Sequence, residues 1–124
     1  QMCIRDRYYQ ELNHMDCQSY LITNNLQYEL IIAMDVMPYI LDISTLIQEI
    51  SQHLKPKGQF LFSVEISQEH PYQLQHHGRF SHHPEFITSL CLAQGLRCIY
   101  QQKIMIRTEN HIPVIGQFYH WEKI

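Results

Sequence analysis

The sequence lacks a long apolar run, a cluster of basic residues and a glycine-rich turn. A helix that crosses a bilayer needs about 20 consecutive apolar residues, and no stretch approaches that length, nor does the amino end contain a signal-peptide core. The formal charge is −3, with lysines and arginines spread along the chain, so no basic footprint for nucleic acid or an anionic membrane is present. The four glycines are scattered, which excludes a GxGxG turn. We expect a soluble, cytoplasmic protein that binds neither nucleic acid nor a membrane.

The cysteines and histidines do not follow the usual spacing of a disulfide or metal framework. Cys3, Cys17, Cys91 and Cys98 contain no CxxC pair, and the last two lie in apolar patterns, which indicates reduced, structural cysteines. The string HHGRFSHH at 76–83 lacks both the i, i+4 spacing of a helical metal site and a nearby cysteine pair. We therefore expect a solvated polar loop there and no metal.

The most informative stretch is an apolar run that stops at a carboxylate. Tyr28 to Ile40 reads YELIIAMDVMPYI, in which Leu30 to Met34 is wholly apolar and Asp35 follows. Such a run is typical of a strand buried on both faces in the middle of a parallel sheet. The first polar residue past the carboxyl end of that strand lies where open α/β sheets bind ligands. Asp35 is thus a candidate functional residue. It is equally well explained as a turn residue, since Asp favours turns.

Hydrophobic periodicity predicts one α/β domain around this strand. Further strands are predicted at Glu11 to Asp16, Gln59 to Glu65, Arg97 to Arg107 and Val114 to Trp121, and helices at Cys17 to Asn25, Asp42 to Leu54 and Pro84 to Gly95. Asp42 is the expected cap of the second helix, and Lys55 to Gly58 is expected to end it. Ile66 to His82 is expected to be a long polar loop of functional importance. The last two strands, joined by the turn Thr108 to Pro113, must pair antiparallel.

Four aromatic residues lie in the last two predicted strands: Tyr100, Phe118, Tyr119 and Trp121. They could form a stacking platform for a ligand. Strands covered by helices use such residues as core, and we expect that role here.

Several stretches, in order, resemble class I methyltransferases that use S-adenosylmethionine. YELIIAMDVMPYI resembles the fourth-strand motif, LKPKGQFLFSVE the L(K/R)PGG turn and fifth strand, and QGLR the GF lead into the sixth strand. GRFSHHPEFITSLCLAQGL and IRTENHIPVIGQFYHWEK resemble a subgroup of predicted methyltransferases, often attached to tetratricopeptide repeats, in which GRY-x-H and LR-x-E-x-x-x-PV-x-G recur. The resemblance covers the chain from Tyr8 onward.

The resemblance implies a fold and a strand order. It implies a partial Rossmann-like methyltransferase sheet, strands three to seven of the family, closed by an antiparallel hairpin. Leu30 to Met34 should lie parallel to Phe60 to Val64, with Val114 to Trp121 next to the latter and Ile99 to Ile106 at the edge.

The family's first strand, Gly-rich turn and second strand have no counterpart in the sequence. We therefore expect residues 8–124 to be the carboxyl-terminal part of a methyltransferase domain that lacks the Gly-rich cofactor half, preceded by a disordered, non-native leader, Gln1 to Arg7. The intact protein would transfer a methyl group from S-adenosylmethionine to an unidentified acceptor, and this chain alone would be inactive. The alternatives are a non-catalytic α/β remnant or partner-binding module and, more weakly supported, a nicotinamide dehydrogenase, whose sheet normally lacks the closing hairpin.

The resemblance also assigns cofactor-binding roles to individual residues. Asp16, after the third strand, would lie near the adenine amino group, and Cys17 would offer its backbone N–H to the ring. Asp35 and Val36 would line the sulfonium end, where a carboxylate holds a cationic centre. Tyr39 would pack beside them.

The acceptor side would contain Glu65, Tyr72, Arg79 and His82. Methyl transfer needs chiefly in-line positioning, with a base only if the acceptor is protonated, and His82 is the one candidate base. Arg79 is expected either to bind an acceptor carboxylate or to pair with Glu65 or Glu69.

Overall fold

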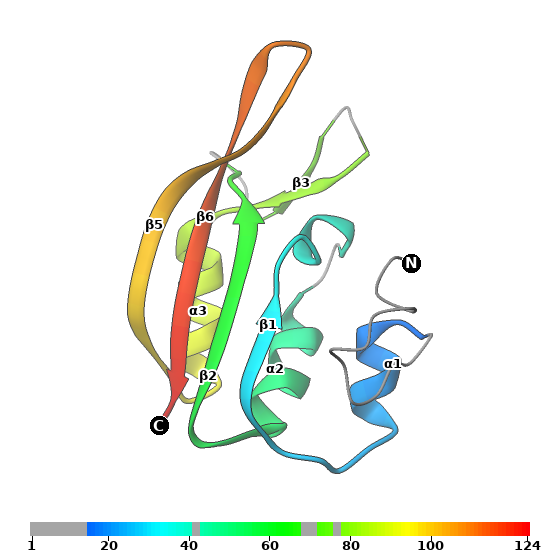
Figure 1. Cartoon of the computed structure of the whole chain (residues 1–124), viewed down its shortest axis with the longest axis vertical. Coiled ribbons are helices and arrows are strands. Elements are labelled where there is room, and N and C mark those ends of the chain that lie inside the picture. The colour runs from blue at the N-terminus through cyan, green and yellow to red at the C-terminus, as the bar shows by residue number, and fades with distance from the viewer. Residues whose placement is uncertain (1–14, 41–42, 68–71, 76–77) are drawn as a thin grey trace, which may run out of the picture.

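A computed structural model describes residues 15–40, 43–67, 72–75 and 78–124, with the backbone alone at positions 72 and 73. The elements follow in the order α1 (Cys17–Ile22), β1 (Tyr28–Ala33), the 3-10 helix η2 (Met37–Tyr39), α2 (Ser44–Gln52), β2 (Leu54–Glu65), β3 (Tyr72–Leu74), β4 (Phe80–His82), α3 (Pro84–Ala93), β5 (Leu96–Glu109) and β6 (Ile112–Lys123). The arrangement in Figure 1 confirms the predicted α/β class.

The main sheet of the described part has four strands in the order β1-β2-β6-β5. β1 and β2 run parallel, with Ile31 opposite Phe60 and Ala33 opposite Phe62. β6 pairs antiparallel with both β2 and β5, and β5 forms the edge. The predicted strand order, including the closing antiparallel hairpin, is confirmed.

Helices α2 and α3 pack on one face of this sheet, behind it in the view of Figure 1. On α2 the buried side chains Leu46, Ile47 and Ile50 recur at helical spacing, as predicted. α3 begins at Pro84, ends before Gly95 and buries Ile87 and Cys91. The core between the helices and the sheet consists of Leu21, Ala33, Met37, Ile43, Leu46, Ile47, Ile50, Leu54, Phe60, Phe62, Val64, Ile87, Cys91, Leu96, Tyr119 and Trp121.

The opposite face of the sheet is not covered by any helix in the part of the chain that the structure describes (Figure 1). Leu30 and Ile32 point to this face and are 51% and 57% exposed, whereas Ala33, on the helix side, is 8% exposed. The prediction that β1 is buried on both faces was therefore wrong. The apolar run identified a strand correctly, but β1 pairs only with β2 among the described strands, so it is an edge strand with one open face.

Two predicted boundaries were also wrong. Lys55 to Gly58 was expected to end a helix, but α2 already ends at Gln52 and these residues lie inside β2, which begins at Leu54. The predicted loop from Ile66 to His82 contains the short antiparallel hairpin β3–β4. Three-residue strands are held by backbone pairing and leave too short a pattern to recognise in the sequence.

The β5–β6 hairpin is longer than predicted, because its turn has two residues where Thr108 to Pro113 was expected to form the turn. Asn110 and His111 have φ values of 50° and 66°, which is the left-handed backbone that a two-residue hairpin turn requires. Of the four aromatic residues, Tyr119 and Trp121 are in the core, as predicted, and Phe118 is half-buried. Tyr100 is 50% exposed, so its core assignment was wrong, because it faces the uncovered side of the sheet.

Some predictions fall on the edge of the described residues or beyond it. Of the strand predicted at Glu11 to Asp16, Met15 and Asp16 are described, and neither is in a strand. The predicted cap Asp42 lies outside the described residues, and the residue before α2 is Ile43, which makes no side-chain cap.

Candidate functional site

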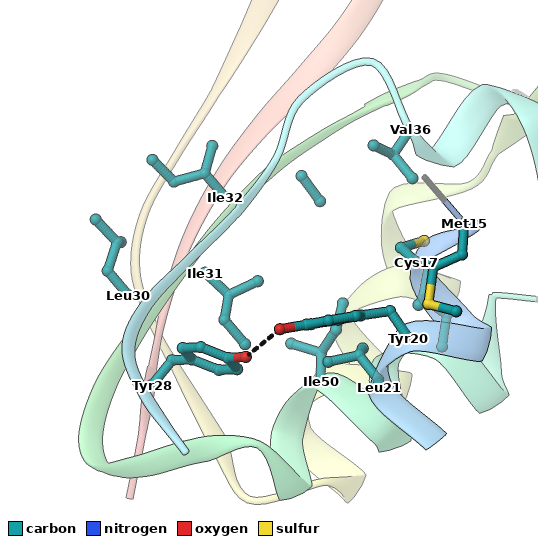
Figure 2. Close-up of a pocket in the computed structure, with 12 residues that line it drawn as sticks. Met15, Cys17, Tyr20, Leu21, Tyr28, Leu30, Ile31, Ile32, Val36 and Ile50 are labelled. Atoms are coloured by element: carbon teal, nitrogen blue, oxygen red, sulfur yellow. Dashed lines mark hydrogen bonds between the residues drawn. The ribbon is translucent and has the colours of Figure 1, made fainter. Parts of the chain in front are cut away.

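An apolar cavity of about 590 Å³ lies between α1, β1 and α2 (Figure 2). Its lining residues are Met15, Cys17, Tyr20, Leu21, Tyr28, Leu30, Ile31, Ile32, Ala33, Val36, Leu46 and Ile50. The hydroxyls of Tyr20 and Tyr28 are hydrogen-bonded across one end at 3.2 Å. Ligand pockets commonly have volumes of about 300 to 1,000 Å³ and mainly apolar walls. The cavity therefore suits a largely apolar group.

The amino end of α1 is fixed beside the cavity by Asp16. Its Oδ1 accepts a hydrogen bond from the Ser19 backbone N–H at 2.9 Å, and its Oδ2 accepts one from the Ser19 hydroxyl at 2.7 Å. These bonds, the backbone one first, lower the pKa of the Asp16 carboxyl. The structure thus places Asp16 as the N-cap of α1, and Cys17, the first helical residue, lines the cavity. The assignment of Asp16 to the adenine amino group stays a prediction.

The turn after β1 borders the same cavity. Asp35 has a φ of 59°, in the left-handed region that Asp tolerates better than most residues, which supports its interpretation as a turn residue. Its side chain is exposed, so the turn also presents a carboxylate to solvent. Val36 lines the cavity, while Tyr39, on η2, is 65% exposed and does not contribute to the lining.

Two of the predicted cofactor residues therefore meet at one place. Cys17 and Val36 belong to segments on opposite sides of β1 in the sequence, and both line the cavity (Figure 2). Asp16 and Asp35 are their immediate neighbours in the chain. The structure brings the two predicted cofactor segments together and leaves Tyr39 outside.

A second group of residues, which we call the charge cluster, lies at the carboxyl end of β2 and consists of Glu65, Arg79, Arg107 and Glu109. Glu65 Oε2 accepts hydrogen bonds from Arg79 Nε at 3.2 Å and from Arg107 Nη2 at 2.6 Å. Glu109 Oε1 accepts from Arg107 Nε at 2.9 Å and also pairs with Arg79. Each carboxylate thus bridges both guanidinium groups. The predicted Arg79–Glu65 pair is present, while Glu69 lies outside the described residues.

His82, the candidate base, is fully buried, with 0% exposure. Its strand β4 contacts β2 and η2, and the His82 carbonyl accepts a hydrogen bond from the Ser67 backbone N–H at 3.0 Å. To act on a bound acceptor, this imidazole would need the β3–β4 hairpin or η2 to move. Tyr72 is the residue paired with His82 across that hairpin.

Sequence reasoning did not nominate Arg107 and Glu109, although both stand in a quoted motif. They are the Arg and Glu of IRTEN, which resembles LR-x-E, while Arg79 and His82 stand in GRFSH, which resembles GRY-x-H. The ion pairs between Arg79 and Glu109 and between Glu65 and both arginines show that the two motifs meet in space. The motifs were a signal that two distant segments share one site.

The order of the described strands, a parallel pair followed by a closing antiparallel hairpin, is that of a partial Rossmann-like α/β sheet. Solved structures with this arrangement include S-adenosylmethionine-dependent methyltransferases. One from Methanosarcina mazei matches with a TM-score of 0.64 and 15% identity over 81% of this chain and 61% of its own. The N-methyltransferase NodS from Bradyrhizobium japonicum, with S-adenosyl-L-homocysteine bound, matches with a TM-score of 0.60 and 16% identity. The match covers 81% of this chain and 48% of NodS. The [4+2]-cyclase SpnF matches with a TM-score of 0.64 and 12% identity, over 80% of this chain and 50% of SpnF.

These likenesses show the fold, and at such identities they show the fold alone. The chain has a partial Rossmann-like fold shared with these structures, and it spans about half to three fifths of their length. No family model and no curated protein matches the sequence.

No helix in the described ranges is long and apolar enough to cross a membrane. Nor do they contain a group of three His, Cys, Asp or Glu side chains placed to hold a metal ion.

Proposed function

We propose that this chain is the carboxyl-terminal part of an S-adenosylmethionine-dependent methyltransferase whose intact form methylates an unidentified acceptor. The observation that carries the proposal is the apolar cavity beside β1, lined by Cys17 and by Val36, the residue that follows Asp35. It lies in a fold shared with S-adenosylmethionine-dependent methyltransferases of known structure. The fold alone is compatible with other activities, so the cavity is what makes the proposal testable.

The cavity fits part of S-adenosylmethionine. Its apolar lining suits an adenine ring, and the exposed carboxylate of Asp35 can attract a sulfonium by charge. Among the described lining side chains, the polar groups are the Cys17 thiol and the hydroxyls of Tyr20 and Tyr28. The two hydroxyls are hydrogen-bonded to each other. The side chains therefore offer few partners for the ribose hydroxyls and the amino-acid end of the cofactor.

The bound cofactor would supply an electrophilic methyl group, and the residues of this chain would position it and the acceptor. η2 follows Val36 directly and contacts β2 and β4, so it lies between the cavity and the strands that hold Glu65 and His82. The proposed acceptor side thus adjoins the proposed cofactor side. We propose in addition that tetratricopeptide repeats precede the methyltransferase domain in the intact protein, on the strength of the motif resemblance.

Calorimetric titration with S-adenosylmethionine tests the proposal. Each missing hydrogen bond to a charged group costs about 1.5 to 3 kcal/mol, so several such losses leave the 124-residue chain with about millimolar affinity or weaker. The chain extended by the sequence that precedes it in its source genome should bind in the micromolar range and transfer methyl groups.

Asp35→Ala should weaken binding by the extended chain, whereas the matched control Glu29→Ala should not. Glu29 is a β1 carboxylate with an 85% exposed side chain that pairs with Lys55 at 3.5 Å, near the opposite end of the strand. Micromolar binding by the 124-residue chain itself, lost in Asp35→Ala, would refute the fragment interpretation and support the site. Absence of binding by the extended chain would refute the proposed function.

A non-catalytic partner-binding module is the second candidate, favoured by the exposed apolar side chains of Leu30, Ile32 and Met34. Met34→Glu distinguishes the two functions, because Met34 is 44% exposed and does not line the cavity. If the preceding part of the same protein covers this face, the variant should lower the extended chain's melting temperature. If a separate partner covers it, the melting temperature should stay unchanged.

A further inference from the structure

We propose that the charge cluster is a carboxylate-binding site in which Glu109 occupies the position of a ligand carboxylate. It rests on the proposed function in one respect: the ligand carboxylate belongs to the methyl acceptor. The binding itself needs no S-adenosylmethionine, so it can be tested separately.

The two carboxylates of the cluster differ in burial. The Glu65 side chain is 3% exposed, whereas that of Glu109 is 29% exposed. A buried charge that loses its partner is strongly destabilising, so Glu65 holds both guanidinium groups in place. An ion pair near the surface contributes little stability, so Glu109 is the member that a competing anion can displace.

The arginines converge on the Glu109 carboxylate from two elements. Arg107 Nε donates to Glu109 Oε1 at 2.9 Å from the same strand, β5, and Arg79, which precedes β4, pairs with the same oxygen. Planar guanidinium groups match the geometry of a carboxylate, and they stay charged at any physiological pH. Without Glu109 both guanidinium groups would lose the more exposed of the two carboxylates that bridge them, at a position that an external carboxylate can take.

The surroundings of the cluster favour access for a ligand. Glu65 is the last residue of β2, and the carboxyl ends of parallel strands are where open α/β sheets bind ligands. Glu109 is the last residue of β5, next to the turn of a hairpin that extends beyond the rest of the sheet (Figure 1). Displacing Glu109 therefore requires movement of the hairpin end alone, while Glu65 and the core beneath it stay in place.

The test is a titration of the 15N-labelled chain with sodium acetate, at constant ionic strength maintained with sodium chloride. The measured quantity is the chemical shift of the Arg79 and Arg107 side-chain N–H groups. Acetate should shift both resonances in the wild type at high concentration. Glu109→Gln removes the internal carboxylate at nearly constant size, and it should tighten acetate binding at least about tenfold. Acetamide, which has the same shape without the charge, should not bind.

Two further variants complete the experiment. Arg107→Gln in the Glu109→Gln background should abolish acetate binding, because one guanidinium group cannot replace two. Glu122→Gln is the matched control: Glu122 also pairs with an arginine, Arg97, but that pair lies at the other end of β5 and β6. This variant should bind acetate as the wild type does.

The outcomes separate the binding site from a purely structural cluster. Acetate affinity in Glu109→Gln no higher than in the wild type or in Glu122→Gln would overturn the proposal. The same conclusion would follow if Glu109→Gln unfolded at the titration temperature, because Glu109 would then be a structural member that no ligand could displace. Acetate binding without S-adenosylmethionine binding by the extended chain would support the site and refute only the methyl-transfer function.

Discussion

Raising the pH from about 6 to about 8 should destabilise this protein through His53. His53 caps the carboxyl end of α2 and is 7% exposed. Its Nδ1 lies 2.8 Å from the carbonyl oxygen of Glu49, and its Nε2 lies 2.9 Å from the carbonyl oxygen of Asn24. A carbonyl oxygen only accepts hydrogen bonds, so both ring nitrogens must donate, and both donate only in the imidazolium form. Both hydrogen bonds can therefore form together only when His53 is charged.

The direction of the pH effect follows from the His53 pKa. Burial by itself lowers this pKa, but the hydrogen bonds to the carbonyls of Asn24 and Glu49, together with the nearby Glu49 carboxylate, outweigh burial and raise it above its ordinary value. The folded protein thus binds the proton more tightly than the unfolded chain. The stabilisation is complete below the unfolded pKa of about 6.5 and is lost as the pH rises through the folded pKa.

The magnitude follows from the bonds that deprotonation removes. One of the two charged hydrogen bonds is lost and the other becomes neutral, and the favourable charge at the end of α2 disappears. We expect a loss of about 1 to 2 kcal/mol in the free energy of unfolding. Urea unfolding at a series of pH values measures it directly. The fluorescence of Trp121, the only tryptophan and 1% exposed, reports the transition.

Two variants isolate His53 from the other histidines. His53→Gln should remove most of the pH dependence between about 6 and 8 and should be less stable than the wild type at the lower pH. His111→Asn changes an exposed histidine in the β5–β6 turn and should keep the wild-type dependence. A stability that is flat or increases over this range, or an unchanged dependence in His53→Gln, would refute the imidazolium assignment.

Three other predictions concern packing. Gly116→Ala should lower the free energy of unfolding by about 1 to 3 kcal/mol, because a Cβ there would collide with the Ile106 side chain and the Val64 carbonyl. Urea unfolding measures this, and a denaturation midpoint equal to that of the wild type would contradict the packing. Cys91, fully buried and with its pKa raised by burial, should resist thiol alkylation until the protein unfolds, while the exposed Cys98 reacts in the native state, as mass spectrometry can show. Deleting Gln1 to Arg7 should leave the melting temperature unchanged, and a decrease of several degrees, roughly 1 kcal/mol, would show that the segment belongs to the fold.

The strands and their order were predictable because local patterns and the family resemblance agreed on them. The run at Leu30 to Met34 and the Phe-rich segment of β2 are both strands, and they pair in parallel as expected. Burial was not predictable to the same degree. An apolar run indicates what a strand can bury, but the exposure of Leu30 and Ile32 depends on which elements lie beside and above β1.

The candidate site was predictable only in part. Asp35 was nominated because its place after an apolar strand is a local property of the chain, and Val36, which lines the cavity, because of the family resemblance. The charge cluster joins Glu65 to Arg79, Arg107 and Glu109, which are far apart in the sequence, and no spacing rule relates them. The burial of His82 was likewise not predictable, since it results from the packing of β4 against β2 and η2.

The two-residue turn between β5 and β6 has a consequence for the order in which the chain folds. Closing a two-residue turn costs little loop entropy, and Asn110 favours the backbone that the turn needs, so the β5–β6 pairing should form early. The parallel β1–β2 pair must instead wait for a crossover through η2 and α2. During synthesis β5 and β6 are made after the other described strands. We therefore expect β2 to lack its antiparallel partner β6 until this hairpin has been made, and cooperative folding of the described sheet to begin with the hairpin.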